Sequence, residues 1–120
     1  MTGRTRHLLD LASVEATCKL HDRRYTGLQM VPIDPIRGSD GRSNEFDRDF
    51  CPLRDYTRER WLNIAVVRQQ GKALPPVELV QIGEVYFCID GHHRISVARA
   101  MGEREIEAQV TVWQVAGLLP

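Results

Sequence analysis

The chain has 120 residues, of which 42% are hydrophobic and 27% charged, and its 16 basic residues balance its 16 acidic ones. This length suits one domain with one core, and zero formal charge argues against binding to DNA or an anionic membrane mainly by bulk charge. The cysteines Cys18, Cys51 and Cys88 have no close spacing and predict neither a disulfide framework nor a zinc site. This use of cysteine fits a reducing cytoplasm best, so we expect a cytoplasmic protein. No apolar run reaches the length of a membrane span, so no membrane partner is expected.

The N-terminal residues predict a helix over residues 7 to about 24, because Leu8, Leu11 and Cys18 recur at roughly helical spacing. Basic residues near its end suit the negative end of the helix dipole. We interpret residues 1–26 as an N-terminal helical arm that packs on the domain or forms a dimer, with nucleic-acid contact as the alternative. Residues 27–120 form the main domain in this interpretation.

The next segment, from Gln29 to Ile33, predicts a short edge strand, because Pro32 and Pro35 limit its pairing. Residues 37–54 then show no period and mix glycine, serine and both signs of charge. A loop of this length in a compact domain is usually functional or mobile. The alternative is a solvated loop whose charges neutralise one another.

A helix with a broad apolar face is predicted to begin near residue 55 and to end at Gly71. Strands at 77–82 and 85–89 follow, and the Gly83-Glu84 pair between them fits a two-residue hairpin turn. These elements predict a helix followed by a β-hairpin.

The last two elements are a helix from Gly91 to Met101 and a half-buried strand in which apolar and polar residues alternate over residues 105–112. The whole order is helix, strand, loop, helix, hairpin, helix, strand. It predicts an α+β fold, a small mixed β-sheet with packed helices, rather than a repeating βαβ array.

The pentapeptide Asp90-Gly91-His92-His93-Arg94 stands where the second hairpin strand ends and a helix begins. Asp90 is expected to cap this helix, and Gly91 lets another group approach the backbone closely. A helix N-terminus attracts anions, and Arg94 adds a forked cation. We therefore predict an anion-binding turn for the phosphates of a nucleotide. The alternative is an ordinary strand–helix connection in which Arg94 pairs with a carboxylate.

A metal site at Asp90, His92 and His93 is a third hypothesis. Adjacent side chains on a helix point about 100° apart, so both histidines rarely bind one ion. This hypothesis is the least favoured of the three.

The turn and the elements around it resemble the ParB/sulfiredoxin superfamily. The similar portion runs from about Met30 to Trp113 and contains VPIDPI, PPVELVQIGEVYFCIDGHHRISVARAMG and EIEAQVTVW. The resemblance implies a ParB/sulfiredoxin-like fold and a nucleotide whose phosphates lie on the helix N-terminus. The residues expected to bind them are Asp90, Gly91, His92, His93 and Arg94, together with Arg42 of the preceding loop.

Three branches of this superfamily imply different functions. Chromosome-partition ParB proteins continue into a DNA-reading module, for which no room follows Trp113, so a full partition function is not expected. Sulfiredoxin carries its catalytic cysteine where this chain has His92, so reduction of sulfinic acid is not expected either. The turn is most similar to the Asp-Gly-His-Thr-Arg turn of the free-serine kinases.

The kinase resemblance implies an acidic general base soon after the opening strand, and Asp40 lies near that position. We expect Asp40, Glu45 and His93 to be catalytic, and Asp47 to help bind Mg²⁺. The reaction would be phosphotransfer from ATP or another nucleotide to a small hydroxyl-bearing substrate, or nucleotide hydrolysis. The alternative is a non-catalytic ParB-like module that binds DNA or a protein, with DNA disfavoured by the zero net charge. A homodimer is also left open.

Overall fold

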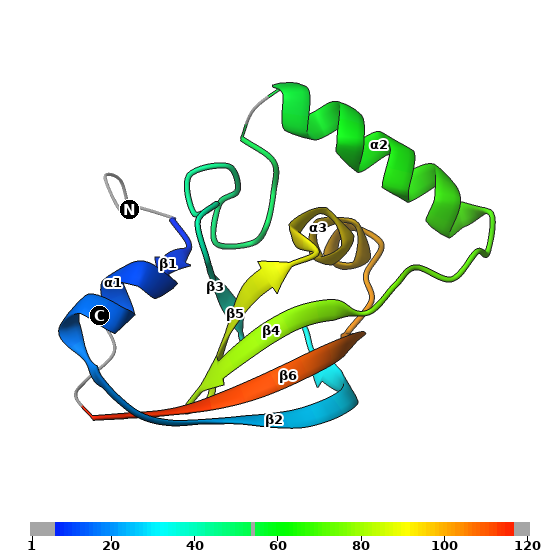
Figure 1. Ribbon diagram of the computed structural model, residues 1–120. Helices are drawn as coiled ribbons and strands as arrows, with labels where there is room; N and C mark the ends of the chain where they lie inside the picture. The colour runs from blue at the N-terminus through cyan, green and yellow to red at the C-terminus, as the bar shows by residue number, and fades with distance from the viewer. Residues whose placement is uncertain (1–6, 54, 117–120) are drawn as a thin grey trace.

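The structure is a computed structural model that describes residues 7–53 and 55–116 (Figure 1). Its strands are β1 Leu9–Asp10, β2 Lys19–Pro32, β3 Ile36–Ser39, β4 Val77–Ile82, β5 Val85–Asp90 and β6 Glu105–Ala116. Its helices are α1 Leu11–Thr17, α2 Asp55–Gln69 and α3 His92–Ala100. The strands form one mixed sheet in the order β1-β3-β5-β4-β6-β2. The predicted α+β class with a small mixed sheet is therefore confirmed.

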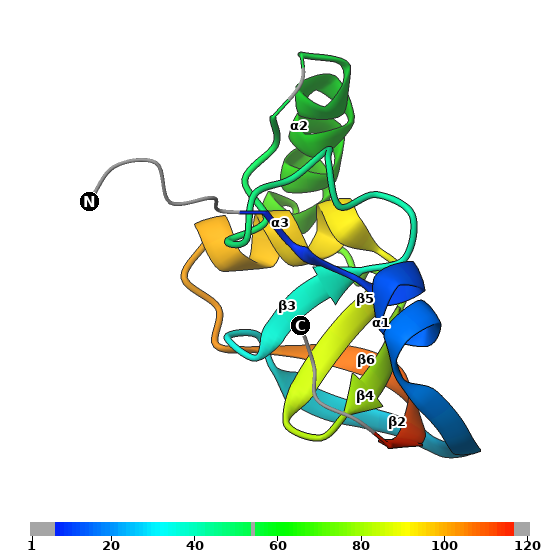
Figure 2. The same ribbon diagram turned by 90° about the vertical axis from the view of Figure 1, so that its left-hand side faces the viewer.

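The sheet combines local and long-range pairing. β4 and β5 form the predicted antiparallel hairpin around Gly83-Glu84, and β6 joins β4 in parallel. β3 lies parallel to β5, whereas β2 runs antiparallel to β6 at the edge of the sheet. Figure 2 shows α3 above the sheet, α2 stacked beyond α3, and α1 at the side.

Two apolar clusters fill the two faces of the sheet. The larger one lies beneath α3 and includes Phe46, Phe50, Val77, Leu79, Cys88, Ile95, Ala108 and Val110. The smaller one, beneath α1, includes Leu11, Val14, Val80, Ile82 and Phe87. Successive strand residues point to opposite faces, which is why Phe87 and Cys88 belong to different clusters. Burial raises the pKa of the Cys88 thiol, as expected for a core residue.

The N-terminal helix is shorter than the sequence predicts. α1 begins at Leu11, after the short strand β1, and ends at Thr17, and residues 19–32 form one strand of 14 residues. The helix prediction for residues 7–10 and 18–24 is therefore wrong. Buried and exposed side chains do not alternate along β2, because nearly all of its side chains are exposed. Backbone hydrogen bonds with β6 hold this strand in the sheet. The predicted boundary between residues 26 and 27 falls inside this strand.

The stretch predicted to lack a pattern begins with a strand. β3 has the polar sequence Ile-Arg-Gly-Ser, yet it is mostly buried beside β5. A Cβ added at Gly38 would lie 2.2 Å from the ring of Phe87, so only glycine permits this close approach. The rest of the stretch, as far as Leu53, takes part in two isolated bridges, His7 with Asp47 and Phe46 with Pro52, and is otherwise irregular.

In the part of the chain that the structure describes, no helix is both long and apolar enough to cross a membrane.

Candidate functional site

A pocket of about 330 Å³ opens to solvent at the N-terminus of α3. Three segments line it: the loop after β3, the middle of α2 and the turn between β5 and α3. The lining residues are Arg42, Arg60, Asn63, Ile64, Asp90, Gly91, His92, His93 and Arg94. All six residues expected to bind phosphates are among them, so the structure brings the loop arginine and the turn together.

The backbone at the turn reverses through Gly91. This residue has a φ of 106° and occupies the N-cap of α3, with no side-chain capping bond. A Cβ there would lie 2.4 Å from Cγ1 of Val77. The expectation that Asp90 caps the helix is therefore wrong. Asp90 instead ends β5, and its Oδ2 accepts a hydrogen bond of 2.9 Å from Nη2 of Arg94.

Arg94 binds the protein as well as lining the pocket. Its Nη1 donates to the carbonyl oxygens of Pro75 and Pro76, at 2.7 and 2.9 Å. These bonds tie α3 to the extended segment that leads into β4. The Arg94 guanidinium thus adds positive charge to the pocket, while three of its hydrogen bonds are already made to protein groups.

The two adjacent histidines are both buried, at 2% and 5% exposure for His92 and His93. His92 Nε2 lies 2.6 Å from Oγ of Ser39, which is itself fully buried. The ring of Phe46 stacks with His92 at a centroid distance of 5.8 Å and meets the edge of His93 at 5.2 Å. His93 Nε2 is buried and has no hydrogen-bond partner among the described residues.

Both histidines are neutral at pH 7. Desolvation, and next the positive charge of Arg42, lower the pKa of His92 and of His93 to about 4. Neither imidazole therefore supplies positive charge to an anion, although a neutral ring can donate or accept one hydrogen bond at each nitrogen as its tautomer dictates.

Arg42 and Glu45 form a forked ion pair beside the histidines. Nε and Nη2 of Arg42 donate to the two carboxylate oxygens of Glu45, at 3.2 and 2.9 Å. The backbone N–H of Arg42 donates to Ser39 Oγ at 3.2 Å. The hydrogen bond from Arg42 lowers the pKa of Glu45, which makes this carboxylate a weak base that orients the arginine.

Asp40 and Asp47, the other two loop acids predicted to have a role, do not line the pocket. Asp40 is exposed directly after β3, and its backbone N–H donates to the carbonyl of Cys88. Asp47 Oδ1 accepts from the backbone N–H groups of Asp49 and Cys51, at 2.9 and 3.0 Å, and so orders the loop. Within residues 7–53 and 55–116, no group of three or more histidines, cysteines or acids could hold a metal ion. The roles of Asp40 as base and Asp47 as metal ligand stay predictions.

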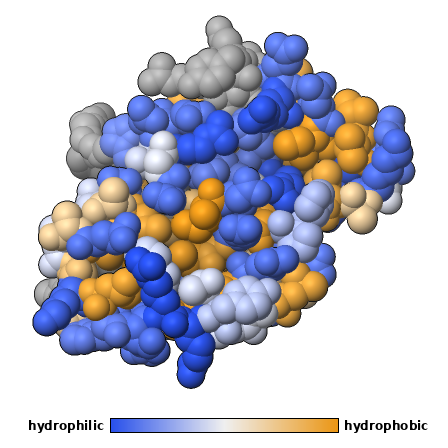
Figure 3. Space-filling model, viewed as in Figure 1, coloured by the Kyte–Doolittle hydropathy of each residue, from blue (hydrophilic) through white to orange (hydrophobic). Residues whose placement is uncertain are grey.

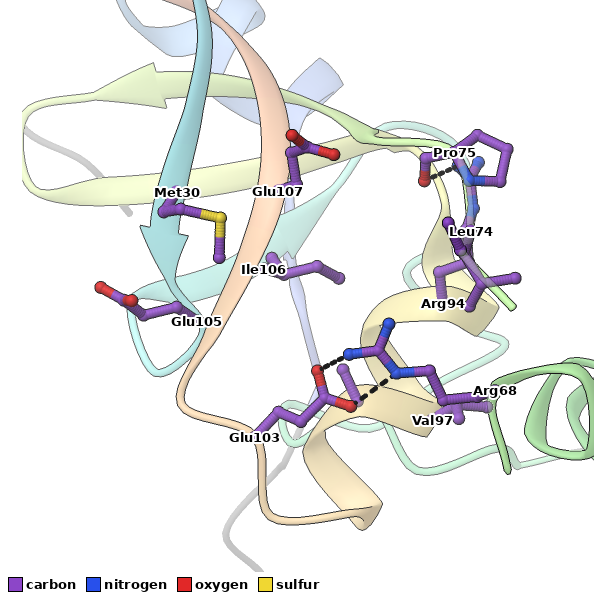
Figure 4. A pocket seen from close by; sticks show the side chains of 12 residues that line it. Met30, Arg68, Leu74, Pro75, Arg94, Val97, Glu103, Glu105, Ile106 and Glu107 are labelled. Carbon is purple, nitrogen blue, oxygen red and sulfur yellow. Dashed lines mark hydrogen bonds and ion pairs between the residues drawn. The ribbon is translucent and has the colours of Figure 1, made fainter. Parts of the chain in front are cut away.

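Arg60 and Asn63 are pocket residues that sequence reasoning missed. They lie on α2, which is fixed to α3 by a 2.8 Å hydrogen bond from Trp61 Nε1 to Ser96 Oγ. A forked ion pair between Arg68 and Glu103 anchors the end of α2, as Figure 4 shows. The available signal was the spacing of Arg60 and Asn63, which places them on one face of the helix.

No protein-family model matches the sequence, and no curated protein matches it. Among solved structures, the chain is similar to the crystal structure of sulfiredoxin from Arabidopsis thaliana, with a TM-score of 0.52. The fold is sulfiredoxin-like. The likeness covers 69% of this chain and 82% of that chain at 14% sequence identity. It confirms the resemblance predicted from the DGHHR turn and its neighbouring elements, at the level of the fold.

Proposed function

We propose that this sulfiredoxin-like domain binds the phosphates of a nucleotide in the pocket at the N-terminus of α3. One observation carries the proposal: His93 Nε2 is buried without a partner among the described residues, and His93 lines an open pocket. An unsatisfied buried polar atom costs about 1–3 kcal/mol. Because Nε2 is closed to solvent in this structure, a ligand oxygen in the pocket would supply the missing hydrogen bond only after a small rotation of the imidazole ring.

The charges around the pocket favour an anion. The positive charges of Arg42, Arg60 and Arg94 outnumber the negative charges of the carboxylates Asp90 and Glu45. The unpaired N–H groups at the start of α3 add a partial positive charge. A volume of about 330 Å³ lies at the lower end of the range for small-ligand sites, which suits a phosphate chain with part of a nucleoside.

Phosphotransfer to a hydroxyl-bearing substrate, or nucleotide hydrolysis, is the candidate reaction. His93 is the pocket residue proposed to take a proton, because its ring is neutral and its Nε2 has no partner among the described residues, although burial lowers its pKa to about 4 and so makes it a weak base. A magnesium ion would be held mainly by the phosphates, with a carboxylate such as Asp90 beside it, and would neutralise their charge. Asp47 as a metal ligand, and the DNA- or protein-binding alternative, remain predictions.

Titration calorimetry with ATP, ADP and CTP, each with and without Mg²⁺, tests the proposal. Arg60→Gln should weaken binding about tenfold, because a hydrogen bond to a charged group contributes about 1.5–3 kcal/mol. Arg104→Gln, at an exposed position outside the pocket, is the matched control and should bind as the wild type does. Absence of binding to all three nucleotides, or equal affinity of the two variants, would overturn the proposal.

A further inference from the structure

The edge strand β2 is unusually long. It has 14 residues, against about 5–6 for a typical strand, and its pairing with β6 shifts register between Leu20 and Asp22 and between Tyr25 and Gly27. Among the described strands it pairs with β6 alone, so half of its backbone donors and acceptors face outward along the other edge. A long free edge is a template for pairing with another strand.

Large apolar side chains are exposed along this edge. Tyr25, Leu28 and Met30 are 61%, 55% and 56% exposed. Tyr25 and Leu28 pair in register with Thr111 and Gln109 of β6 and lie on the face of the sheet opposite α3. Met30 pairs with Glu107 and lines a pocket with Arg94 and Val97 of α3. Figure 3 shows that apolar surface is also exposed over the middle of the sheet and beside α2. A contiguous exposed apolar row of this kind marks an interaction surface.

The two ends of the edge carry opposite charge. Lys19, Arg23 and Arg24 outnumber Asp22 in the first half of β2, and Arg23 lies 3.8 Å from Glu15 of α1. The second half of β2 lies beside Glu105 and Glu107 of β6. Figure 4 shows Met30 next to both of these carboxylates. An antiparallel pair of such edges places the basic end of each beside the acidic end of the other. The surface is thus complementary to itself.

We propose that two copies of this chain pair through β2, antiparallel, about a two-fold axis between Thr26 and Gly27. In this register Tyr25 lies opposite Leu28 of the second copy, and Arg23 lies opposite its Met30, with Glu107 on the next strand. Each contact occurs twice by symmetry. Shifting the axis toward Lys19 would bring Arg23 and Arg24 of both copies together, and like charges opposite each other destabilise a strand pair.

The pairing uses none of the residues that line the pocket at α3, so it is independent of the proposed nucleotide binding. It joins the two six-stranded sheets into one continuous sheet. Pairing also gives partners to the free backbone groups of β2, which removes the exposed edge from both copies.

Sedimentation velocity on the full chain tests the proposal. The wild type should sediment as a dimer of a 13.7 kDa chain, and Leu28→Glu should weaken the association at least about tenfold. Leu62→Glu on α2 is the matched control, since Leu62 is 53% exposed, and it should leave the dimer intact. Circular dichroism verifies that each variant is folded.

A charge exchange tests the register. Arg23→Glu should weaken the dimer, and the double variant R23E/E107R should restore it, because the opposite charges face each other again with exchanged signs. A wild type that stays monomeric up to about 1 mM, or a dimer that Leu28→Glu leaves unchanged or Leu62→Glu weakens equally, would overturn the pairing. Failure of the double variant to recover would overturn the proposed axis.

Discussion

Replacement of Gly91 by alanine should destabilise the protein by about 2–5 kcal/mol. An L-residue in a left-handed conformation costs about 1–2 kcal/mol, and Gly91 has a φ of 106°. The added Cβ would also lie 2.4 Å from Cγ1 and 2.8 Å from Cβ of Val77, a fully buried side chain. Overpacking of this kind typically costs a further 1–3 kcal/mol. The sum is a large share of the 5–15 kcal/mol that stabilises a typical domain.

Urea unfolding followed by circular dichroism measures this loss. Gly83→Ala is the control, because Gly83 also has a positive φ, of 60°, but no atom lies within 4 Å of an added Cβ. It should therefore show the backbone cost alone. In the double variant Gly91→Ala with Val77→Ala, the contact with Cγ1 is removed and the one with Cβ remains, so the clash is partly relieved and the combined cost should be less than the sum of the single costs.

The reasoning fails if Gly91→Ala is no more destabilising than Gly83→Ala, or if the double variant shows the full sum. In either case Val77 would not limit the position of the turn. The same variant should weaken nucleotide binding, because any shift of the backbone at Gly91 moves the first N–H groups of α3.

Three further predictions concern the residues around the pocket. Above about pH 6.5 the free energy of unfolding should be level, and it should fall as the pH drops toward about 4, by at most about 3 kcal/mol for each histidine. In this window His92 and His93 protonate in the unfolded chain but stay neutral in the folded one; a urea series in which stability rises on acidification would contradict this. Phe46→Ala should cost about 3–5 kcal/mol in urea unfolding and Phe46→Leu clearly less, since the ring is fully buried against both imidazoles; equal losses would exclude a packing role. Trp61→Phe should cost about 1 kcal/mol by removing the bond to Ser96, and should lower nucleotide affinity in calorimetry; unchanged affinity would mean that the position of α2 is irrelevant to binding.

Local signals made the second half of the fold predictable. Gly83-Glu84 identified the hairpin and Gly71 the end of α2, because turns and helix ends require particular residues. The full length of β2 and the existence of β3 were not predicted. Their side chains show no useful periodicity, and what holds them is backbone pairing with β6 and β5, segments distant in the sequence.

The site was predictable to a similar extent. The DGHHR turn identified five of the residues that line the pocket, because a strand–glycine–helix junction has a local signature. The hydrogen bonds from Arg94 to the carbonyls of Pro75 and Pro76 could not be predicted, since these partners lie 19 and 18 residues away in the sequence. Arg60 was missed for a related reason: a solvent-facing arginine on a helix gives no sign of what packs beside it.

The two tryptophans of the chain lie at different places in the fold, which gives each proposed interaction an optical reporter of its own. The indole of Trp61 is bonded to α3 beside Arg60 of the pocket, whereas that of Trp113 lies 4.6 Å beneath the guanidinium of Arg23 on the edge strand. Fluorescence emission from Trp61 should therefore respond to ligand occupancy, and emission from Trp113 to self-association. Two single-tryptophan variants, each measured in its own sample, would let fluorescence follow the two events separately.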